Sequence, residues 1–228
     1  MEKYDVIVLG GGPGGYAAAI RAAQLGASAL LIEREKIGGA CLNRGCIPTK
    51  AIIACTNLFE KLKKSESFGI KTESTTIDFK QVIDRKNNIV SKVTKGVEFL
   101  LEKNGVKVIS GTGTVLGPGK VEIISKTCDR QQVTGDKTIL ATGSSPICLP
   151  GIKFDAKRFL SSDDLLEYRP VPEKLMIVGG GVIGIHFAMI YSALGTAVTI
   201  CEALPEILPG MDEDIVELVK RIFRRRKI

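Results

Sequence analysis

The stretch DVIVLGGGPGG, residues 5–15, decides the fold of this chain. The apolar run VIVL does not alternate with polar residues, which is typical of a strand covered on both faces. An alanine-rich helix is expected over residues 16–25, with Gly26 as its C-terminal cap. A second buried strand over residues 29–32 then ends on Glu33. The pattern predicts a β-α-β unit and therefore an α/β fold.

The glycines of this stretch have the spacing G-x-G-x-x-G, at Gly10, Gly12 and Gly15. Such glycines allow a tight turn and let the backbone approach a pyrophosphate, which sits at the positive N-terminus of the helix. An acid at the end of the second strand, here Glu33, accepts hydrogen bonds from a ribose. Because strand, helix, strand and acid follow in the right order, a dinucleotide site is favoured over a glycine-rich turn without a ligand.

The same unit returns later in the chain. Residues 175–184 read LMIVGGGVIG, and a second acid, Glu202, again ends the following strand. Each element lies 169 residues after its counterpart, including the helix cap. The sequence therefore predicts two dinucleotide sites, the second with its glycines at Gly179, Gly181 and Gly184.

Between the two units lies GACLNRGCIPTK, residues 39–50, with Cys41 and Cys46 four residues apart and Lys50 close by. A helix N-terminus and a nearby cation favour a thiolate, the species that attacks a disulfide. A bond across slightly more than one helical turn would distort that turn, and strained bridges are easier to reduce. The pair is either a redox-active disulfide or two packed thiols, and the flanking nucleotide sites favour redox chemistry.

Composition narrows the function classes. The chain has 228 residues, 44% hydrophobic and 25% charged, with no apolar run long enough to span a membrane and no signal peptide, so we expect a soluble protein. The net charge of +7 and the basic residues 224–227 suggest nucleic acid binding, but acids begin and bases end a helical pattern after Asp212, so a solvated helix end is favoured. We expect no metal site, because the only histidine is His186 and the Cys41 to Cys46 gap does not match structural zinc loops.

The region between the units is expected to be mostly helical over residues 59–104 and then to form short strands separated by glycine turns. Prolines at 146 and 150 place a domain boundary near residue 150. The expected strands cover residues 106–109, 113–116, 120–124, 132–134 and 137–140.

The stretch GGACLNRGCIPTK, residues 38–50, resembles the flavin-dependent pyridine-nucleotide disulfide oxidoreductases. Within them it is most similar to the dihydrolipoamide dehydrogenases, because Leu42 and Ile47 stand where glutathione and mercuric reductases tend to carry valine. The resemblance runs through essentially the whole chain. It implies two Rossmann-like domains, both incomplete at the C-terminal side, with residues 1–149 binding FAD and carrying the redox disulfide and residues 150–228 binding NAD.

The resemblance also implies roles for single residues. Cys46 would face the flavin and form the charge-transfer thiolate, and Cys41 would exchange with a substrate dithiol. Electrons would pass from dihydrolipoamide through this pair to FAD and on to NAD. Glu202 is followed by no basic residue, which favours NAD over NADP. The implied cofactor residues are Gly10, Gly12, Gly15, Glu33, Lys50, Gly113, Thr142, Gly143 and Ser144 for FAD, and Gly179, Gly181, Gly184 and Glu202 for NAD.

The sequence departs from the family in two places. The family carries a glutamate at position 186 that pairs with the lysine near the flavin, whereas this chain has His186, so Lys50 loses an anionic partner. We expect impaired nicotinamide binding or flavin reduction; the alternative is a tolerated change at the edge of the site. The chain also ends at Ile228, before the interface domain whose histidine and glutamate act as acid and base across a dimer, so we expect a fragment with poor turnover.

Partners and location follow from the resemblance. It implies a lipoyl-domain substrate in 2-oxoacid dehydrogenase complexes, a homodimer for the full-length form, and neither nucleic acid nor membrane as a partner. The cytoplasm is expected, or the mitochondrial matrix for a processed chain. The alternatives are a truncated, non-catalytic nucleotide-binding module that acts through a partner chain, and a related disulfide or mercuric reductase.

Overall fold

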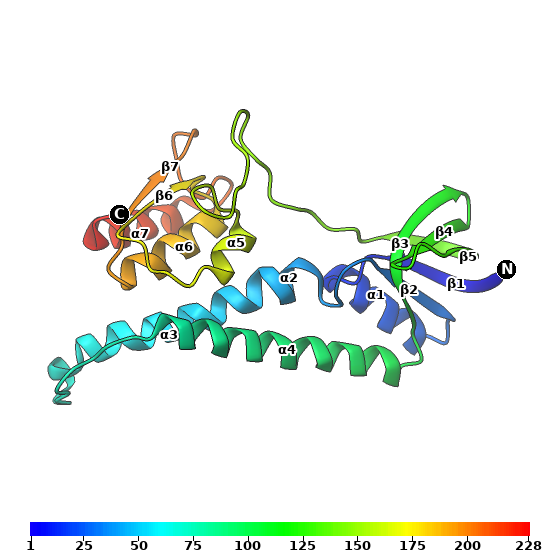
Figure 1. Ribbon diagram of the computed structural model, residues 1–228, viewed down its shortest axis with the longest axis horizontal. Coiled ribbons are helices and arrows are strands. Elements are labelled where there is room, and N and C mark those ends of the chain that lie inside the picture. Colours follow the sequence, from blue (N-terminus) through cyan, green and yellow to red (C-terminus); the bar gives the residue numbers. More distant parts are fainter. The chain divides into compact units, whose positions relative to one another are not determined.

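The computed structural model describes residues 1–228, and Figure 1 labels their helices and strands. The chain divides into two compact units. Unit 1 consists of Met1–Pro48 and Asn87–Asp163, and unit 2 of Thr49–Lys86 and Asp164–Ile228. Helices α3 (Cys46–Lys63) and α4 (Phe79–Lys103) each begin in one unit and end in the other, so the units are not successive in sequence. The division into nucleotide domains near residue 150 stays a prediction.

Unit 1 is built on a closed barrel. Strand β1 (Glu2–Leu9) pairs in parallel with β2 (Ala29–Glu33) on one side and with β5 (Arg130–Leu140) on the other. Strand β3 (Lys107–Gly117) runs parallel to β2, and β4 (Lys120–Ser125) joins β3 and β5 in antiparallel pairing. The parallel strands therefore form one side, and the antiparallel strand β4 closes the barrel.

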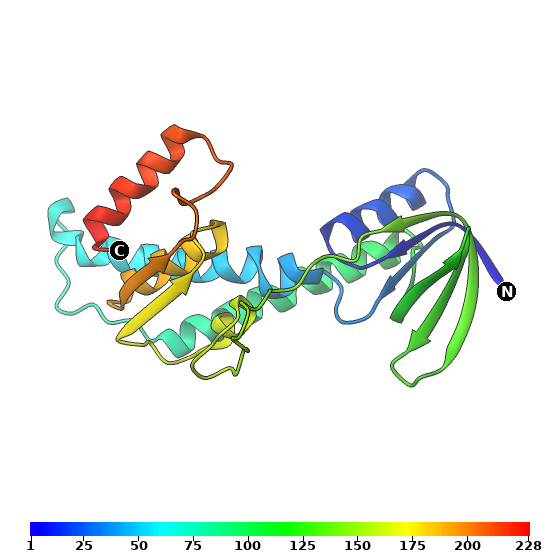
Figure 2. The same ribbon diagram turned by 90° about the horizontal axis from the view of Figure 1, so that it is seen from above.

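The side chains of β1 point alternately into two hydrophobic cores. Ile7 and Leu9 point into the barrel and pack with Ile123 of β4. Val8 points to the other face, where α1 (Pro13–Gln24) and the C-terminal part of α4 cover the sheet (Figure 2). The relative exposure is 0% for Ile7 and Val8 and 4% for Leu9, which confirms a strand covered on both faces. Each such side chain contributes roughly 1.5–3 kcal/mol by leaving water.

The expectation of five short strands between residues 106 and 140 is wrong, because three strands, two of them long, occupy this region. Gly111 and Gly135, expected between strands, lie inside β3 and β5, and Gly113 also lies inside β3. A Cβ on Gly113 would lie 2.6 Å from Leu9 Cδ2, and one on Gly135 would lie 2.7 Å from Ile7 Cγ1. These glycines let the barrel close tightly around the side chains of β1.

The helical expectation for residues 59–104 holds only in part. Helix α3 already begins at Cys46, and a short 3₁₀ helix, η1 (Ser65–Phe68), follows its end. Residues 70–78 are not helical, and α4 then covers the remaining part with Val82, Ile83, Val97 and Leu101 buried. The buried side chains of α4 therefore belong to the hydrophobic core.

Unit 2 contains the second β-α-β unit. Strand β6 (Lys174–Val178) pairs in parallel with β7 (Ala197–Cys201), and α6 (Val182–Ala193) connects them. The sheet has only these two strands, and Met176 and Val178 on β6 are 66% and 58% exposed. The repeat thus keeps the unit but not the neighbours that bury β1 in unit 1.

Ion pairs tie the remaining helices of unit 2. Lys86, with 1% of its side chain exposed, pairs with Glu167 of α5 (Ser162–Glu167). Helix α7 (Glu213–Arg226) follows Asp212, whose carboxylate accepts a hydrogen bond from the Asp214 N–H at 3.3 Å. Acids begin α7 and arginines end it, which confirms the predicted helix.

None of the helices combines the length and apolar character needed to cross a membrane.

Helix α1 and strand β1 meet backbone to backbone. A Cβ on Gly15 would overlap the carbonyl oxygen of Gly10 and would lie 3.4 Å from Val8 Cγ1. A Cβ on the neighbouring Gly14 would have only the Cβ of Ala141 near it, at 3.9 Å. Two adjacent glycines of one helix therefore differ sharply in the space they have.

We expect Gly15→Ala to destabilise the fold by about 3 kcal/mol or more, because backbone blocks the added methyl group. Gly14→Ala is the matched control and should be neutral or stabilising by up to about 1 kcal/mol, because alanine is the better helix former. Urea unfolding followed by circular dichroism measures both variants. Equal stability of the two variants would contradict the close approach.

Candidate nucleotide and redox site

The first glycine loop forms an open cradle at the start of α1. Gly10 has φ of 103°, in the left-handed region, and Gly12 is the N-cap residue of α1. No side chain caps this helix and no acid lies in its first turn, so its first N–H groups suit an anion. A Cβ on Gly12 would have only the Cα of Gly39 near it, at 3.8 Å. The cradle therefore fits a pyrophosphate group.

Glu33 lies across this loop. Its Oε2 accepts a hydrogen bond from the Gly11 N–H at 2.6 Å, and its Oε1 accepts one from the Glu35 N–H at 2.6 Å. A carboxylate oxygen has two lone pairs, so each oxygen retains one acceptor position. The half-exposed carboxylate is thus held in place and can still accept from the hydroxyls of a ribose.

The end of β5 covers the same loop. A Cβ on Gly10 would overlap the carbonyl group of Ala141 and would lie 3.2 Å from the Cα of Thr142. Gly143 and Ser144 continue from Thr142 as an exposed segment, and no atom would lie within 4 Å of a Cβ on Gly143. The structure therefore brings Thr142 to the glycine loop, with Gly143 and Ser144 directly after it.

Gly113 occupies a different position. It lies within β3, where a Cβ would meet Leu9 Cδ2 at 2.6 Å and Ile32 Cγ2 at 3.4 Å. These side chains end β1 and β2, so Gly113 borders the loop end of the barrel from the inside. Its missing side chain makes room for the core, while its predicted adenine contact stays a prediction.

The two cysteines flank a break between helices. Helix α2 (Gly39–Arg44) contains Cys41, and Cys46 is the first residue of α3. Gly45 lies between the helices, and a Cβ on it would lie 3.3 Å from the Cα of Cys41. Gly45 therefore packs closely against the backbone of Cys41 just before Cys46. Cys41 is half-buried against the core, and Cys46 is exposed.

Residues 38–50, the stretch with the two cysteines proposed as a redox pair (the redox stretch), pack directly on the first glycine loop. The Gly38 N–H donates to the carbonyl oxygen of Gly11 at 2.8 Å. A Cβ on Gly39 would lie 2.6 Å from the Cα of Gly12. Sequence reasoning missed the role of Gly38 and Gly39, for which the only signal is a pair of adjacent glycines before Cys41.

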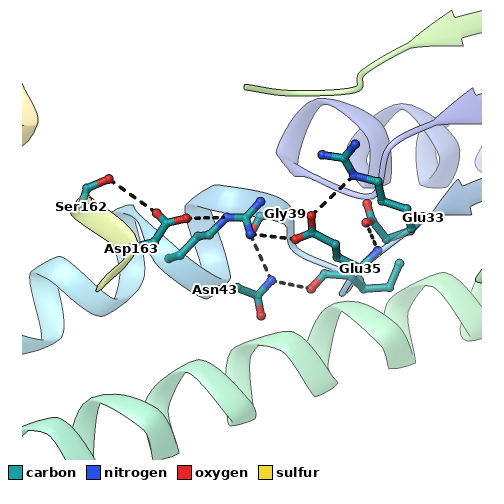
Figure 3. A network of polar contacts seen from close by, with 9 residues as sticks. Glu33, Glu35, Gly39, Asn43, Ser162 and Asp163 are labelled. Atoms are coloured by element: carbon teal, nitrogen blue, oxygen red, sulfur yellow. Dashed lines mark hydrogen bonds and ion pairs between the residues drawn. The ribbon is translucent and has the colours of Figure 1, made fainter. Parts of the chain in front are cut away.

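A polar network fixes the end of α2, and Figure 3 shows it from close by. Arg44 Nη1 lies 2.7 Å from Glu35 Oε2, and Arg44 Nε lies 3.3 Å from Asp163 Oδ2. The Asn43 amide donates to the carbonyl oxygens of Ile37 and Gly39, both at 3.0 Å. Sequence reasoning did not find this network, because its members come from separate segments of unit 1.

The second glycine loop repeats the first. Gly179 has φ of 105°, and a Cβ on Gly184 would overlap its carbonyl oxygen. Glu202 Oε2 accepts from the Gly180 N–H at 2.6 Å, and Oε1 accepts from the Leu204 N–H at 2.9 Å. Backbone hydrogen bonds from Leu204 and Gly180 lower the pKa of the Glu202 carboxyl. An ionised acid therefore faces the second loop.

The N-terminus of α6 also fits a nucleotide. Gly181 is its N-cap residue, no side chain caps the helix, and no acid lies in its first turn. No atom would lie within 4 Å of a Cβ on Gly179 or on Gly181. The second cradle is therefore more open than the first, in which β5 covers Gly10.

Within unit 2, the positive charge of Lys50 acts on the His186 side chain. Burial and then the positive charge of Lys50 lower the pKa of the His186 imidazole below its usual value. His186 is half-buried on α6, and Lys50 is exposed on α3. The imidazole is consequently neutral at pH 7 and supplies no negative charge to Lys50.

The comparisons with known proteins agree with this geometry. The family model described as pyridine nucleotide-disulphide oxidoreductase matches residues 4–228. A dihydrolipoyl dehydrogenase of Acholeplasma laidlawii is 42% identical over 229 residues, which cover 98% of this chain and 67% of the relative. One of Bacillus subtilis is 38% identical over 234 residues, which cover 99% of this chain and 49% of the relative.

A solved structure shares the fold. The crystal structure of LpdA from Mycobacterium tuberculosis matches all of this chain with a TM-score of 0.90 at 29% identity, and the match covers 50% of that structure. The chain thus spans about half the length of LpdA and of the Bacillus subtilis relative. Since the family model covers nearly every residue, this chain belongs to the pyridine nucleotide-disulphide oxidoreductase family.

Proposed function

We propose that this chain serves a dihydrolipoyl dehydrogenase reaction, in which a dithiol gives an electron pair to the Cys41–Cys46 couple and NAD receives it through FAD. The observation that carries the proposal is the contact between redox stretch and glycine loop, namely the Gly38 N–H on the Gly11 carbonyl oxygen at 2.8 Å. A sulfur couple and a nucleotide cradle are thereby parts of one packed structure. The named relatives support the same reaction.

FAD and NAD are the cofactors of dihydrolipoyl dehydrogenases in this family. When bound, FAD supplies two-electron chemistry between thiols and a nicotinamide. In this chain, Gly10, Gly12 and Gly15 would admit its pyrophosphate and Glu33 would accept its ribose hydroxyls. Lys50, Gly113, Thr142, Gly143 and Ser144 are the further residues proposed to hold it, within a domain of residues 1–149.

The second loop would hold NAD in the same manner, within a domain of residues 150–228. Glu202 is ionised and fixed by two backbone donors, so it would accept hydrogen bonds from a free ribose. An ionised acid would repel a 2′-phosphate, and Ala203 and Leu204 after it provide no cation to bind one. NAD is therefore proposed rather than NADP, with Gly179, Gly181 and Gly184 beside its pyrophosphate.

The two sulfurs are proposed to have different roles in electron transfer. Cys46 is the first residue of a helix of 18 residues, and it is assigned to the side of the flavin. Cys41 is assigned to exchange with the substrate. Dihydrolipoamide on a lipoyl domain of a 2-oxoacid dehydrogenase complex is the proposed substrate, with a homodimer as the active assembly and the cytoplasm as its location.

Glu33→Gln should weaken FAD retention and leave NADH affinity unchanged, and Glu202→Gln should do the reverse. Loss of a charged acceptor costs about 1.5–3 kcal/mol, which corresponds to roughly tenfold or more in affinity. Flavin absorbance per chain after gel filtration and NADH fluorescence titration measure the two effects. Equal loss of both ligands in both variants would contradict the assignment of one loop to each cofactor.

Cys41→Ser and Cys46→Ser should each abolish the long-wavelength absorbance that a dithiol produces in the yellow protein, because one sulfur cannot form the couple. Cys128→Ser is the matched control, since Cys128 is an exposed cysteine of the same unit in the turn after β4. Anaerobic titration with reduced lipoamide provides the spectra. A colourless wild-type protein that binds neither nucleotide would contradict the proposed reaction.

His186→Glu should speed flavin bleaching by NADH by about fivefold, because a carboxylate beside Lys50 would be worth roughly 1 kcal/mol for a partly exposed pair. His186→Gln keeps the site neutral and should match the wild-type rate at pH 7. Anaerobic stopped-flow absorbance gives the rates. Equal rates for all three proteins would identify His186 as a tolerated change at the edge of the site.

A further inference from the structure

Arg44 holds a position between the two cysteines that none of the assignments above uses. It is the last residue of α2, directly before Gly45, which packs closely against the backbone of Cys41. Cys46 follows one residue later. Contacts that hold the Arg44 side chain therefore also constrain the backbone turn that sets the position of Cys46 relative to Cys41.

Two carboxylates form ion pairs with different edges of the Arg44 guanidinium. Nη1 meets Glu35 Oε2 at 2.7 Å, while Nε meets Asp163 Oδ2 at 3.3 Å. Glu35 and Asp163, both labelled in Figure 3, come from separate segments of unit 1. Because a guanidinium is planar and rigid, two partners on different edges fix its orientation as well as its position.

Glu35 is itself anchored to the nucleotide loop. Its N–H donates to Glu33 Oε1 at 2.6 Å, and Glu33 Oε2 accepts from the Gly11 N–H at 2.6 Å. A chain of charged hydrogen bonds thus runs from the glycine loop to Arg44. On the other side, Asn43 holds the carbonyl oxygen of Gly39 at 3.0 Å and steadies the first turn of α2.

We propose that Arg44 is a positioning residue for the Cys41–Cys46 couple: its two ion pairs hold the Gly45 turn so that the sulfurs are preorganised to bond. The inference rests on the proposed redox function of this pair. Preorganisation raises the effective concentration of one thiol at the other and so favours the closed disulfide over the dithiol.

The test is an exchange equilibrium with glutathione, which needs no bound cofactor. One glutathione disulfide is reduced to two glutathione thiols, while Cys41 and Cys46 lose two protons and two electrons and form one S–S bond. Trapping the mixture with acid and alkylating it, followed by mass spectrometry, gives the ratio of disulfide to dithiol. Peptide mapping confirms that the bond joins these two cysteines.

Arg44→Met should lower the equilibrium constant for disulfide formation by about fivefold, which is about 20 mV for a two-electron couple. Arg44→Lys should recover part of the loss, because an ammonium keeps the charge but lacks the two-edged geometry. Glu35→Gln should shift the constant in the same direction as Arg44→Met, and it serves as the test if that variant fails to fold.

Arg34→Met is the matched control, because Arg34 also pairs with Glu35, at 3.5 Å, but is not part of the cysteine turn. It should keep the wild-type constant. A constant for Arg44→Met or Glu35→Gln equal to or above that of Arg34→Met would overturn the proposal. Failure of the wild-type protein to form the Cys41–Cys46 bond would instead overturn the proposed function, so the two failures are distinguishable.

Discussion

The whole site depends on one steric constraint, the contact of Gly15 with the carbonyl group of Gly10. No side chain fits there, so α1 starts directly at the end of β1 with its first N–H groups exposed at the loop. That placement also brings Gly11 within reach of Glu33 and presents Gly12 as the surface on which Gly39 lies. A wider spacing of helix and strand would separate the glycine loop, Glu33 and residues 38–50 from one another.

The repeat shows which parts of this arrangement belong to the β-α-β unit itself. Gly184 meets Gly179 as Gly15 meets Gly10, and Glu202 is held by the same two kinds of backbone donor as Glu33. The surroundings differ, because β1 lies between two parallel strands whereas β6 pairs with one. The loop geometry is therefore local, while the cover over the loop comes from distant segments.

This distinction explains what could be predicted from the sequence. Local patterns were enough for β1, α1, β2 and their repeat, for the acids at the strand ends and for the charges that begin and end α7. The uninterrupted strand β3 could not be predicted, because the reason for Gly113 is the Leu9 side chain of another strand. Arg44 was missed for a related reason, since its partners Glu35 and Asp163 are joined to it only by the fold.

The hydrogen bond from Gly38 to Gly11 has a thermodynamic consequence. It joins the backbone that leads to the cysteines to the backbone of the first glycine loop, the proposed FAD site. A nucleotide that binds more tightly when the disulfide is closed must, by linkage, favour closing it by the same factor. In that case the affinity of the glycine loop for a nucleotide and the equilibrium between disulfide and dithiol are linked. Selection that changes one of these properties then changes the other.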